Sequence, residues 1–146
     1  MENLFQSFTT SVLKIYKLIQ KIKLHEMRGY GLKGIHVMCM YYLRERPEGL
    51  TASELMRLTL DDKAAISRAL KLLSDKGYIE YDEKTYNSRI RLTPAGFEVA
   101  EDVSVKADKA VSAVAEDFTD EQREFFHGTL ARIVEHLESY YGELHK

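Results

Sequence analysis

The segment from residue 51 to residue 96 constrains the fold of this chain most, because its helix-end signals follow one another closely. Thr51 opens a T-x-x-E capping box, which is a pattern that starts a helix. Asp61 or Asp62 can cap a second helix, and Gly77 can close it. The segment therefore predicts two short helices joined by a tight turn.

A hairpin is predicted directly after these two helices. Residues 78–82 and residues 89–92 are β-prone runs on either side of a polar tip at residues 83–88. Thr93 and Pro94 then have the N-cap and N1 chemistry of a further helix. The order of elements predicts a winged helix-turn-helix, in which one helix can enter a DNA groove while the hairpin contacts the neighbouring backbone.

The two faces of the second helix of this motif differ in chemistry. Its apolar residues recur at spacings of three and four and share one face, which we expect to be buried: Ile66, Ala69, Leu70 and Leu73. Its opposite face has small and basic residues, and a bulky acid there would be repelled by phosphate. This outward face suits a helix in the major groove, and a solvated helix face is the alternative interpretation.

Long amphipathic helices flank the motif. Apolar residues of segment 3–27 fall on one stripe, and those after the T-x-x-Q box at Thr119 follow the spacing of a coiled-coil seam. We predict that both stripes form a dimer interface; packing of the last helix inside its own monomer is the alternative. The predicted interface residues are Leu4, Phe8, Val12, Phe126, Leu130, Ile133, Leu137, Tyr140 and Leu144.

The chain is long enough for one domain with its own core. A chain of 146 residues can bury roughly 70% of its unfolded surface on folding. We predict a mainly α-helical fold with a small β-hairpin wing, in which residues 33–96 form the winged helix-turn-helix. Residues 1–32 and 97–146 would form the dimerisation helices. The apolar runs are too short to span a bilayer and the start lacks a signal-peptide pattern, so we expect a cytoplasmic protein without a membrane partner.

The net charge of −2 conceals an uneven distribution of charge. Residues 1–46 are rich in lysine and arginine, whereas residues 97–146 are rich in aspartate and glutamate. The two regions would attract each other if they packed together. Solvated helix faces are the alternative, because exposed ion pairs contribute little free energy.

Two runs resemble the MarR family of bacterial transcriptional regulators, and the similarity in element order covers essentially the whole chain. Residues 62–68, DKAAISR, match the Asp-Lys-small-small-aliphatic-Ser/Thr-Arg run at the start of the family's recognition helix. Residues 92–96, LTPAG, match its Leu-Thr-x-x-Gly run after the wing. The resemblance implies a homodimeric regulator, usually a repressor, that binds a pseudo-palindromic operator in double-stranded DNA.

The resemblance also indicates which side chains would contact DNA. Lysine and arginine can pair with guanine, and each good bidentate contact discriminates by about 1–3 kcal/mol, while other contacts hold phosphates. The family's Asp-x-Arg wing signature is absent here, and Arg89 is our candidate for the wing arginine, oriented by Asp82 or Glu83. The predicted DNA-binding residues are Thr51, Lys63, Ala64, Ala65, Ser67, Arg68, Lys71, Lys84, Asn87 and Arg89.

Many MarR regulators are released from DNA by small aromatic ligands, and the resemblance implies such an effector here. Family pockets lie between the dimer helices and the DNA-binding unit, and an apolar cavity with a few polar groups suits a planar acid or phenol. The residues predicted to contact this effector are Tyr16, Tyr30, His36 and Met40. Ordinary core packing of these side chains is the alternative.

The sequence contains no arrangement that predicts catalysis, a cofactor or a metal site. It has no Gly-rich phosphate loop and no G-x-S-x-G. His25, Glu26 and His36 flank one loop but have no third or fourth ligand motif. Cys39 has no adjacent cation to lower its pKa, so we expect a buried structural cysteine.

The alternative to a DNA-binding regulator is a winged-helix dimer that has lost DNA binding and docks a protein partner. The pair Ala64-Ala65 favours this alternative, because alanine cannot form hydrogen bonds with base edges and can only touch thymine methyl groups. Net acidity favours it as well. A steep loss of DNA affinity with rising salt would distinguish a regulator from a docking module.

Overall fold

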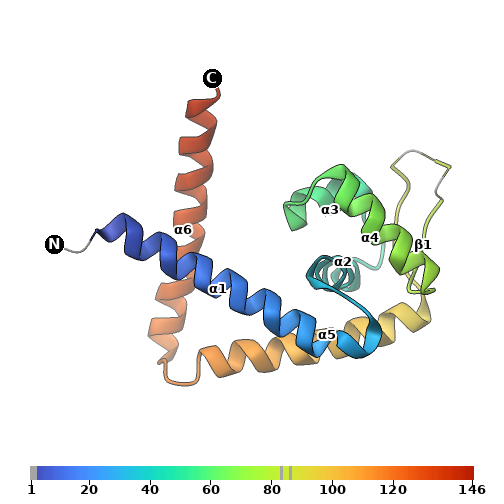
Figure 1. Ribbon diagram of the computed structural model, residues 1–146, viewed down its shortest axis with the longest axis horizontal. Helices are drawn as coiled ribbons and strands as arrows, with labels where there is room; N and C mark the ends of the chain where they lie inside the picture. Colours follow the sequence, from blue (N-terminus) through green and yellow to red (C-terminus); the bar gives the residue numbers. More distant parts are fainter. Residues whose placement is uncertain (1–2, 83, 86) are drawn as a thin grey trace. The chain divides into compact units, whose positions relative to one another are not determined.

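The computed structural model describes residues 3–82, 84–85 and 87–146. The chain divides into two compact units, residues 1–106 and residues 107–146. The elements shown in Figure 1 are α1 (Leu4–Glu26), a 3-10 turn (Arg28–Tyr30), α2 (Gly34–Glu45), α3 (Ala52–Thr59), α4 (Lys63–Asp75), β1 (Ile79–Glu80), β2 (Arg91–Leu92), α5 (Pro94–Val114) and α6 (Asp120–Leu144). The predicted fold class, mainly α-helical with a small β-hairpin wing, is confirmed.

Helices α2, α3 and α4 pack against one another and enclose the core of the first unit (Figure 1). Met40, Leu55 and Leu73 have no exposed surface. The apolar face predicted for α4 is buried, since all four of its residues are among the buried residues of that helix. Burial of this face determines which side of α4 faces solvent, because successive residues of a helix point about 100° apart.

Capping side chains define the ends of the two helices of the motif. Thr51 Oγ1 accepts a hydrogen bond from Glu54 N at 3.2 Å, and Glu54 Oε2 accepts one from Thr51 N at 2.8 Å. Asp62 Oδ1 accepts a hydrogen bond from Ala65 N at 2.8 Å, so Asp62 caps α4. Each contact satisfies an N–H group that has no partner within the helix.

The wing is shorter than the sequence predicts. Strands β1 and β2 are antiparallel with only two residue pairs, Ile79 with Leu92 and Glu80 with Arg91. The predicted first strand extended through Asp82, but the Asp82 carboxylate accepts a hydrogen bond from Lys84 N at 3.0 Å. This local bond begins a turn, which ends the strand early.

A third short segment extends the sheet. Leu50 and Ile90 form an isolated antiparallel bridge, in which Ile90 N donates to Leu50 O at 2.8 Å and Leu50 N donates to Ile90 O at 3.1 Å. The bridge joins the loop before α3 to the second half of the wing. Both side chains are buried, so the base of the wing is part of the core.

Gly96 allows the wing and α5 to approach closely. A Cβ atom added to Gly96 would lie 1.9 Å from the carbonyl oxygen of Tyr78. Thr93 N donates to that same oxygen at 3.0 Å, and Thr93 Oγ1 accepts from Gly96 N at 3.1 Å. Glycine is therefore the residue that fits where α5 begins against the wing.

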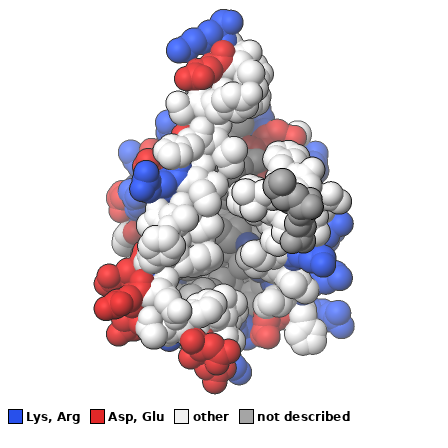
Figure 2. Space-filling view, turned by 90° about the vertical axis from the view of Figure 1, so that its left-hand side faces the viewer, with Lys and Arg blue, Asp and Glu red and all other residues white. Residues whose placement is uncertain are grey.

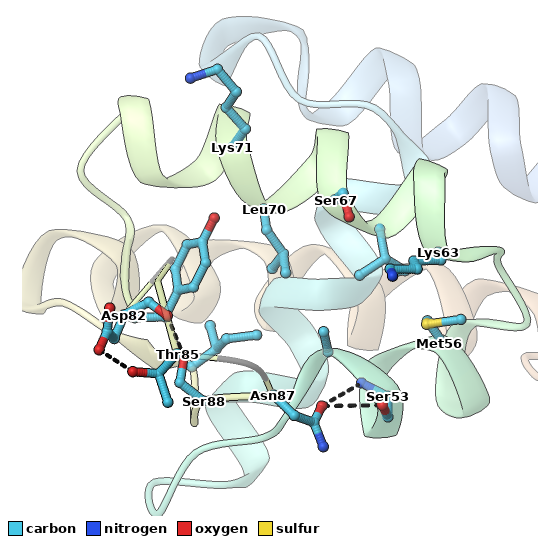
Figure 3. Close-up of a pocket in the computed structure, with 14 residues that line it drawn as sticks. Ser53, Met56, Lys63, Ser67, Leu70, Lys71, Asp82, Thr85, Asn87 and Ser88 are labelled. Atoms are coloured by element: carbon cyan, nitrogen blue, oxygen red, sulfur yellow. Dashed lines mark hydrogen bonds between the residues drawn. The ribbon is translucent and has the colours of Figure 1, made fainter.

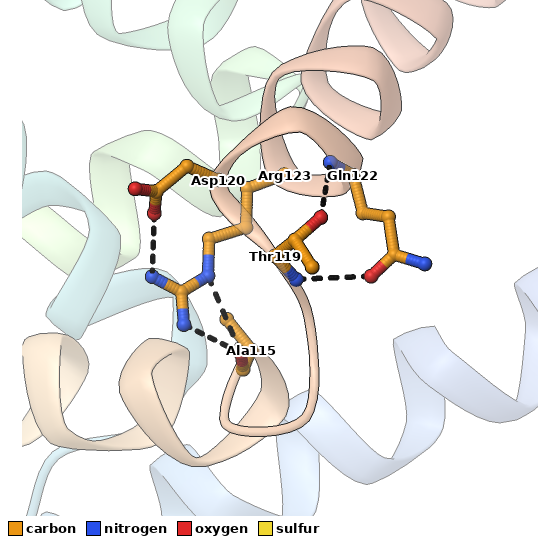
Figure 4. A network of polar contacts seen from close by, with 5 residues as sticks. All are labelled: Ala115, Thr119, Asp120, Gln122 and Arg123. Atoms are coloured by element: carbon orange, nitrogen blue, oxygen red, sulfur yellow. Dashed lines mark hydrogen bonds and ion pairs between the residues drawn. The ribbon is translucent and has the colours of Figure 1, made fainter.

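In the second unit, the turn between α5 and α6 is held by Arg123 (Figure 4). Its Nε and Nη2 atoms donate to Ala115 O at 3.3 and 2.8 Å, and Nη1 lies 3.5 Å from Asp120 Oδ1. Thr119 caps α6 by accepting from Gln122 N at 3.2 Å, as the sequence predicts. The guanidinium group thus adds two donors to the Ala115 carbonyl oxygen, just past the end of α5, which also accepts from Phe118 N at 3.1 Å.

Among the described residues, none of the helices has both the length and the apolar composition required to cross a bilayer.

Leu60 generates a prediction about stability. It ends α3 with a φ of 59°, in the left-handed region that glycine favours, and its side chain is 88% exposed. Replacing Leu60 with Gly should raise the free energy of unfolding by about 0.5–1 kcal/mol, since relief of backbone strain outweighs the added unfolded-state entropy. Thermal unfolding should show a rise in Tm of roughly 2–4 °C.

Leu58→Gly is the matched control for this substitution. Leu58 lies inside α3 and is less exposed, so glycine there should lower the Tm instead. A fall in Tm for Leu60→Gly would show that the leucine side chain itself stabilises the turn.

Candidate nucleic-acid interface

The outward face of α4 has the composition that the sequence predicts. The side chains of Lys63, Ala64, Ser67, Arg68 and Lys71 are exposed. Ala65 is half-buried, which places it at the edge of this face. We name these six residues the α4 surface.

The basic groups of the α4 surface are available for an anionic partner. Within the described part of the chain, no carboxylate forms an ion pair with Lys63 or Arg68. Lys71 Nζ lies 3.9 Å from Asp75 Oδ2, and both side chains are largely exposed. An exposed pair of this kind contributes little free energy, so a phosphate could replace the carboxylate.

Two acids lie next to this basic surface, and one of them has a structural role. The Asp62 carboxylate is at the start of α4, where it caps the helix and meets the positive end of the helix dipole. Asp61 precedes it and is half-buried. The capping role accounts for the acidic residue beside a surface that would face phosphate.

Arg89 is not oriented by Asp82, one of the two residues that the sequence suggests. Its Nη1 atom donates to Gly49 O at 3.0 Å, while the Asp82 carboxylate bonds Lys84 N and the Thr85 hydroxyl. The prediction that Asp82 orients Arg89 is therefore wrong, because donors two and three residues away occupy this carboxylate. Glu83, the other suggested partner, lies outside the described residues.

The environment of Arg89 includes the N-terminal end of α3. The pKa of Glu54 is lowered, first by the hydrogen bond from Thr51 N and also by the positive charge of Arg89. Thr51, which was predicted to hold a phosphate, is half-buried, and its hydroxyl is used in the capping box. Thr51 and Arg89 thus lie near each other at the base of the wing.

A cavity of about 460 Å³ separates the wing from α4 (Figure 3). Met56, Ile66 and Leu70 contribute apolar surface to it, and Lys63 and Lys71 contribute from α4. Strand β1 contacts α4, while this cavity lies between the helix and the tip of the wing. The distance of the tip from that helix must depend on other contacts.

Ser53 makes one such contact, and sequence analysis did not identify it. The Oδ1 atom of Asn87, in the wing, accepts hydrogen bonds from Ser53 Oγ at 3.1 Å and from Ser53 N at 3.4 Å (Figure 3). The two residues are 34 positions apart. No short-range pattern could have revealed this pair.

The residues predicted to contact an effector do not line the cavity beside the wing. Met40 is fully buried in the core, and Tyr16 is 59% exposed on α1. The Tyr30 hydroxyl donates to Asp102 Oδ2 at 2.8 Å, which raises the pKa of Tyr30 and lowers that of Asp102. His36 is buried, and its Nδ1 accepts from Lys33 N at 2.9 Å. The effector site stays a prediction.

Cys39 is buried with no exposed surface. Burial raises the pKa of its thiol to about 12. A thiolate is the reactive form of cysteine, so this thiol is poorly suited to sense oxidants. Among the described residues, there is also no group of three or more histidine, cysteine or acidic side chains placed to hold a metal ion.

The residues of the predicted dimer interface are exposed in the single chain, apart from Ile133, which is half-buried. No described residue of α1 or of α6 is buried. Exposed fractions range from 42% for Phe8 and Leu130 to 83% for Leu4. Figure 2 shows one face of the molecule on which uncharged side chains predominate, with charged groups mostly toward its edges.

Comparisons with known proteins agree with this geometry. The model of the MarR family matches residues 30–85. No curated protein sequence matches the chain. The family match spans α2, α3, α4 and the start of the wing. It therefore includes the whole α4 surface.

Solved structures share the fold over nearly the whole chain. A MarR transcriptional regulator from Methanosarcina mazei Go1 is 20% identical with a TM-score of 0.82, and the match covers 92% of each chain. A MarR protein from Peptoclostridium difficile is 18% identical with a TM-score of 0.86, covering 99% of this chain and 95% of that one. The S. aureus MepR–DNA complex is 16% identical with a TM-score of 0.79, covering 89% and 97%.

Proposed function

Because the model of the MarR family matches residues 30–85 of this chain, we propose that the protein is a sequence-specific DNA-binding transcriptional regulator that acts as a homodimer. The observation that carries the proposal is the α4 surface, in which Lys63 and Arg68 form no ion pair with any described residue and lie opposite a buried apolar face. The DNA complex of MepR, a protein with the same fold, supports it.

The α4 surface would lie in the major groove. Lys63, Ser67 and Arg68 would reach base edges, and Lys71 would hold a phosphate. Ala64 and Ala65 have no donor or acceptor in their side chains, so they would permit close approach and contact thymine methyl groups. Direct base readout would therefore rest mainly on two cations and one hydroxyl group.

A second copy of the chain would complete the operator-binding unit. Two recognition helices must lie about 34–36 Å apart to enter successive major grooves on one side of the duplex. The exposed apolar stripes of α1 and α6 would form the interface, since an isolated chain rarely exposes so much apolar surface. The lysines of α1 and the acidic residues of α6 would attract each other across such an interface.

We further propose that the protein represses transcription by occupying a promoter and that a small aromatic effector releases it. An effector that favours another spacing of the two recognition helices would shift the population away from DNA. Met40 has no exposed surface here, so the predicted pocket would have to open for binding.

Arg68→Ala tests the DNA-binding proposal. Loss of one bidentate base contact costs about 1–3 kcal/mol, so affinity for operator DNA should fall by roughly 5- to 150-fold. The operator can be found by footprinting the DNA upstream of the protein's own gene, and affinity measured by fluorescence anisotropy. Lys109→Ala removes the same charge from an exposed position on α5 and should leave the affinity unchanged.

The salt dependence of the wild-type protein separates DNA binding from protein docking. The logarithm of DNA affinity should fall linearly with the logarithm of salt concentration if several phosphates are contacted.

For the Arg68→Ala variant, an operator affinity equal to that of the wild type would contradict the proposed role of the α4 surface.

Leu137→Asp tests the dimer. A carboxylate on the apolar stripe of α6 should reduce the particle from twice the chain mass to the chain mass of 16.9 kDa in light scattering. Ser139→Asp adds the same group about 200° around the helix and should leave the dimer intact. A monomeric wild-type protein would refute the proposed interface.

Titration of the DNA complex with a panel of phenols and aromatic acids tests the effector. At least one compound should lower the DNA affinity of the wild-type protein. Unchanged affinity across a broad panel would count against control by an aromatic ligand.

A further inference from the structure

The wing tip is bonded to α3 through one amide group. Asn87 Oδ1 accepts hydrogen bonds from the hydroxyl and from the backbone N–H of Ser53, at 3.1 and 3.4 Å. Ser53 lies in the first turn of α3, where backbone N–H groups have no partner within the helix. The Ser53–Asn87 contact therefore satisfies a helix donor from outside the helix while it fixes the wing.

The contact also fixes the orientation of the Asn87 amide. A backbone N–H can only donate, so the oxygen of the amide must face Ser53. The NH2 group then points away from α3, as Figure 3 shows. Asn87 is exposed, so the two N–H donors of this group are open to a partner.

The backbone at Asn87 supports this arrangement. Its φ of 56° lies in the left-handed region, which asparagine adopts more readily than most residues. In this conformation the Asn87 side chain bonds Ser53 of α3. Glycine at this position would keep the backbone conformation and remove only the amide.

The hydrogen bonds of Asp82 order the wing tip internally and do not reach α4. The Asp82 carboxylate accepts from Lys84 N and the Thr85 hydroxyl, and Asp82 O accepts from Ser88 Oγ at 2.9 Å. Only two residue pairs link β1 to β2, and the 460 Å³ cavity lies between the wing and α4. The Ser53–Asn87 contact is thus a long-range bond that joins the tip to α3 beside this cavity.

Arg89 has a different position from the Asn87 amide. Its guanidinium is bonded to Gly49 O at the base of the wing, beside the first turn of α3. That bond uses one of its five N–H groups, so Arg89 and Asn87 can both donate to DNA from different places on the wing.

We propose that Ser53 is a positioning residue for DNA recognition, which holds Asn87 so that its amide NH2 donates to an acceptor in the minor groove. This proposal rests on the proposed function. Adenine N3 and thymine O2 are the acceptors that A·T pairs present there, and they match a two-donor amide. Ser53 itself acts through Asn87 and need not touch DNA.

A double-mutant cycle tests the proposal on the full-length protein. Ser53→Ala and Asn87→Gly should each lower operator affinity several-fold, and the double variant should bind no more weakly than Asn87→Gly alone. Ser53→Thr retains the hydroxyl and should restore wild-type affinity. Hydroxyl-radical footprints of Ser53→Ala should lose protection at the operator flanks and keep it at the centre, a pattern that general unfolding would not produce.

Other results would contradict either the positioning role of Ser53 or the proposed function. Additive losses in the double variant, or wild-type affinity for Ser53→Ala, would overturn the positioning role alone. Loss of protection across the whole footprint would show that Ser53 stabilises the fold and does not position the wing. A wild-type protein that binds no DNA would overturn the proposed function together with this proposal.

Discussion

The apolar face of α4 is buried in the core, and this burial sets the geometry of both the α4 surface and the wing. Ile66, Leu70 and Leu73 pack into the core with α2 and α3, so the residues about 180° around the helix must face solvent. Any rotation of α4 that buried Lys63 or Arg68 would expose this apolar face and leave a charge without solvent or a partner. The hydrophobic core thereby determines which side chains a DNA duplex could meet.

Core packing fixes the base of the wing, and hydrogen bonds order its tip. Its base is fixed by the Leu50–Ile90 bridge and by the close approach of Gly96 to Tyr78. Beyond that base, the strands end after two pairs and a cavity replaces packing. Local bonds to Asp82 and the long-range bond to Ser53 then determine the geometry of the tip, so single polar substitutions there should change position more than stability.

The elements that the sequence predicts well are those with local signals. Thr51, Asp62 and Thr119 cap helices where their spacing indicates, because a capping bond joins residues only two or three positions apart. The periodicity of α4 correctly predicts its buried face for the same reason. The structure also resolves a choice that the sequence left open, since Asp62 and not Asp61 caps α4.

Features that depend on distant residues were not predictable in this way. The partners of Arg89 and Asn87 come from segments far away in the sequence, and β-propensity alone did not reveal that Asp82 would start a turn. Ser53 looked like an ordinary residue of the first turn of a capped helix. Its importance follows only from the fold that brings the wing over α3.

Photo-crosslinking tests the proposal that the α4 surface rests against base pairs. A photoreactive amino acid in place of Ala64, at the centre of this surface, should crosslink to operator DNA on irradiation. The same amino acid in place of Lys109 should not. Crosslinking from position 109 with none from position 64 would contradict the account, because the DNA would then lie against a different part of the chain.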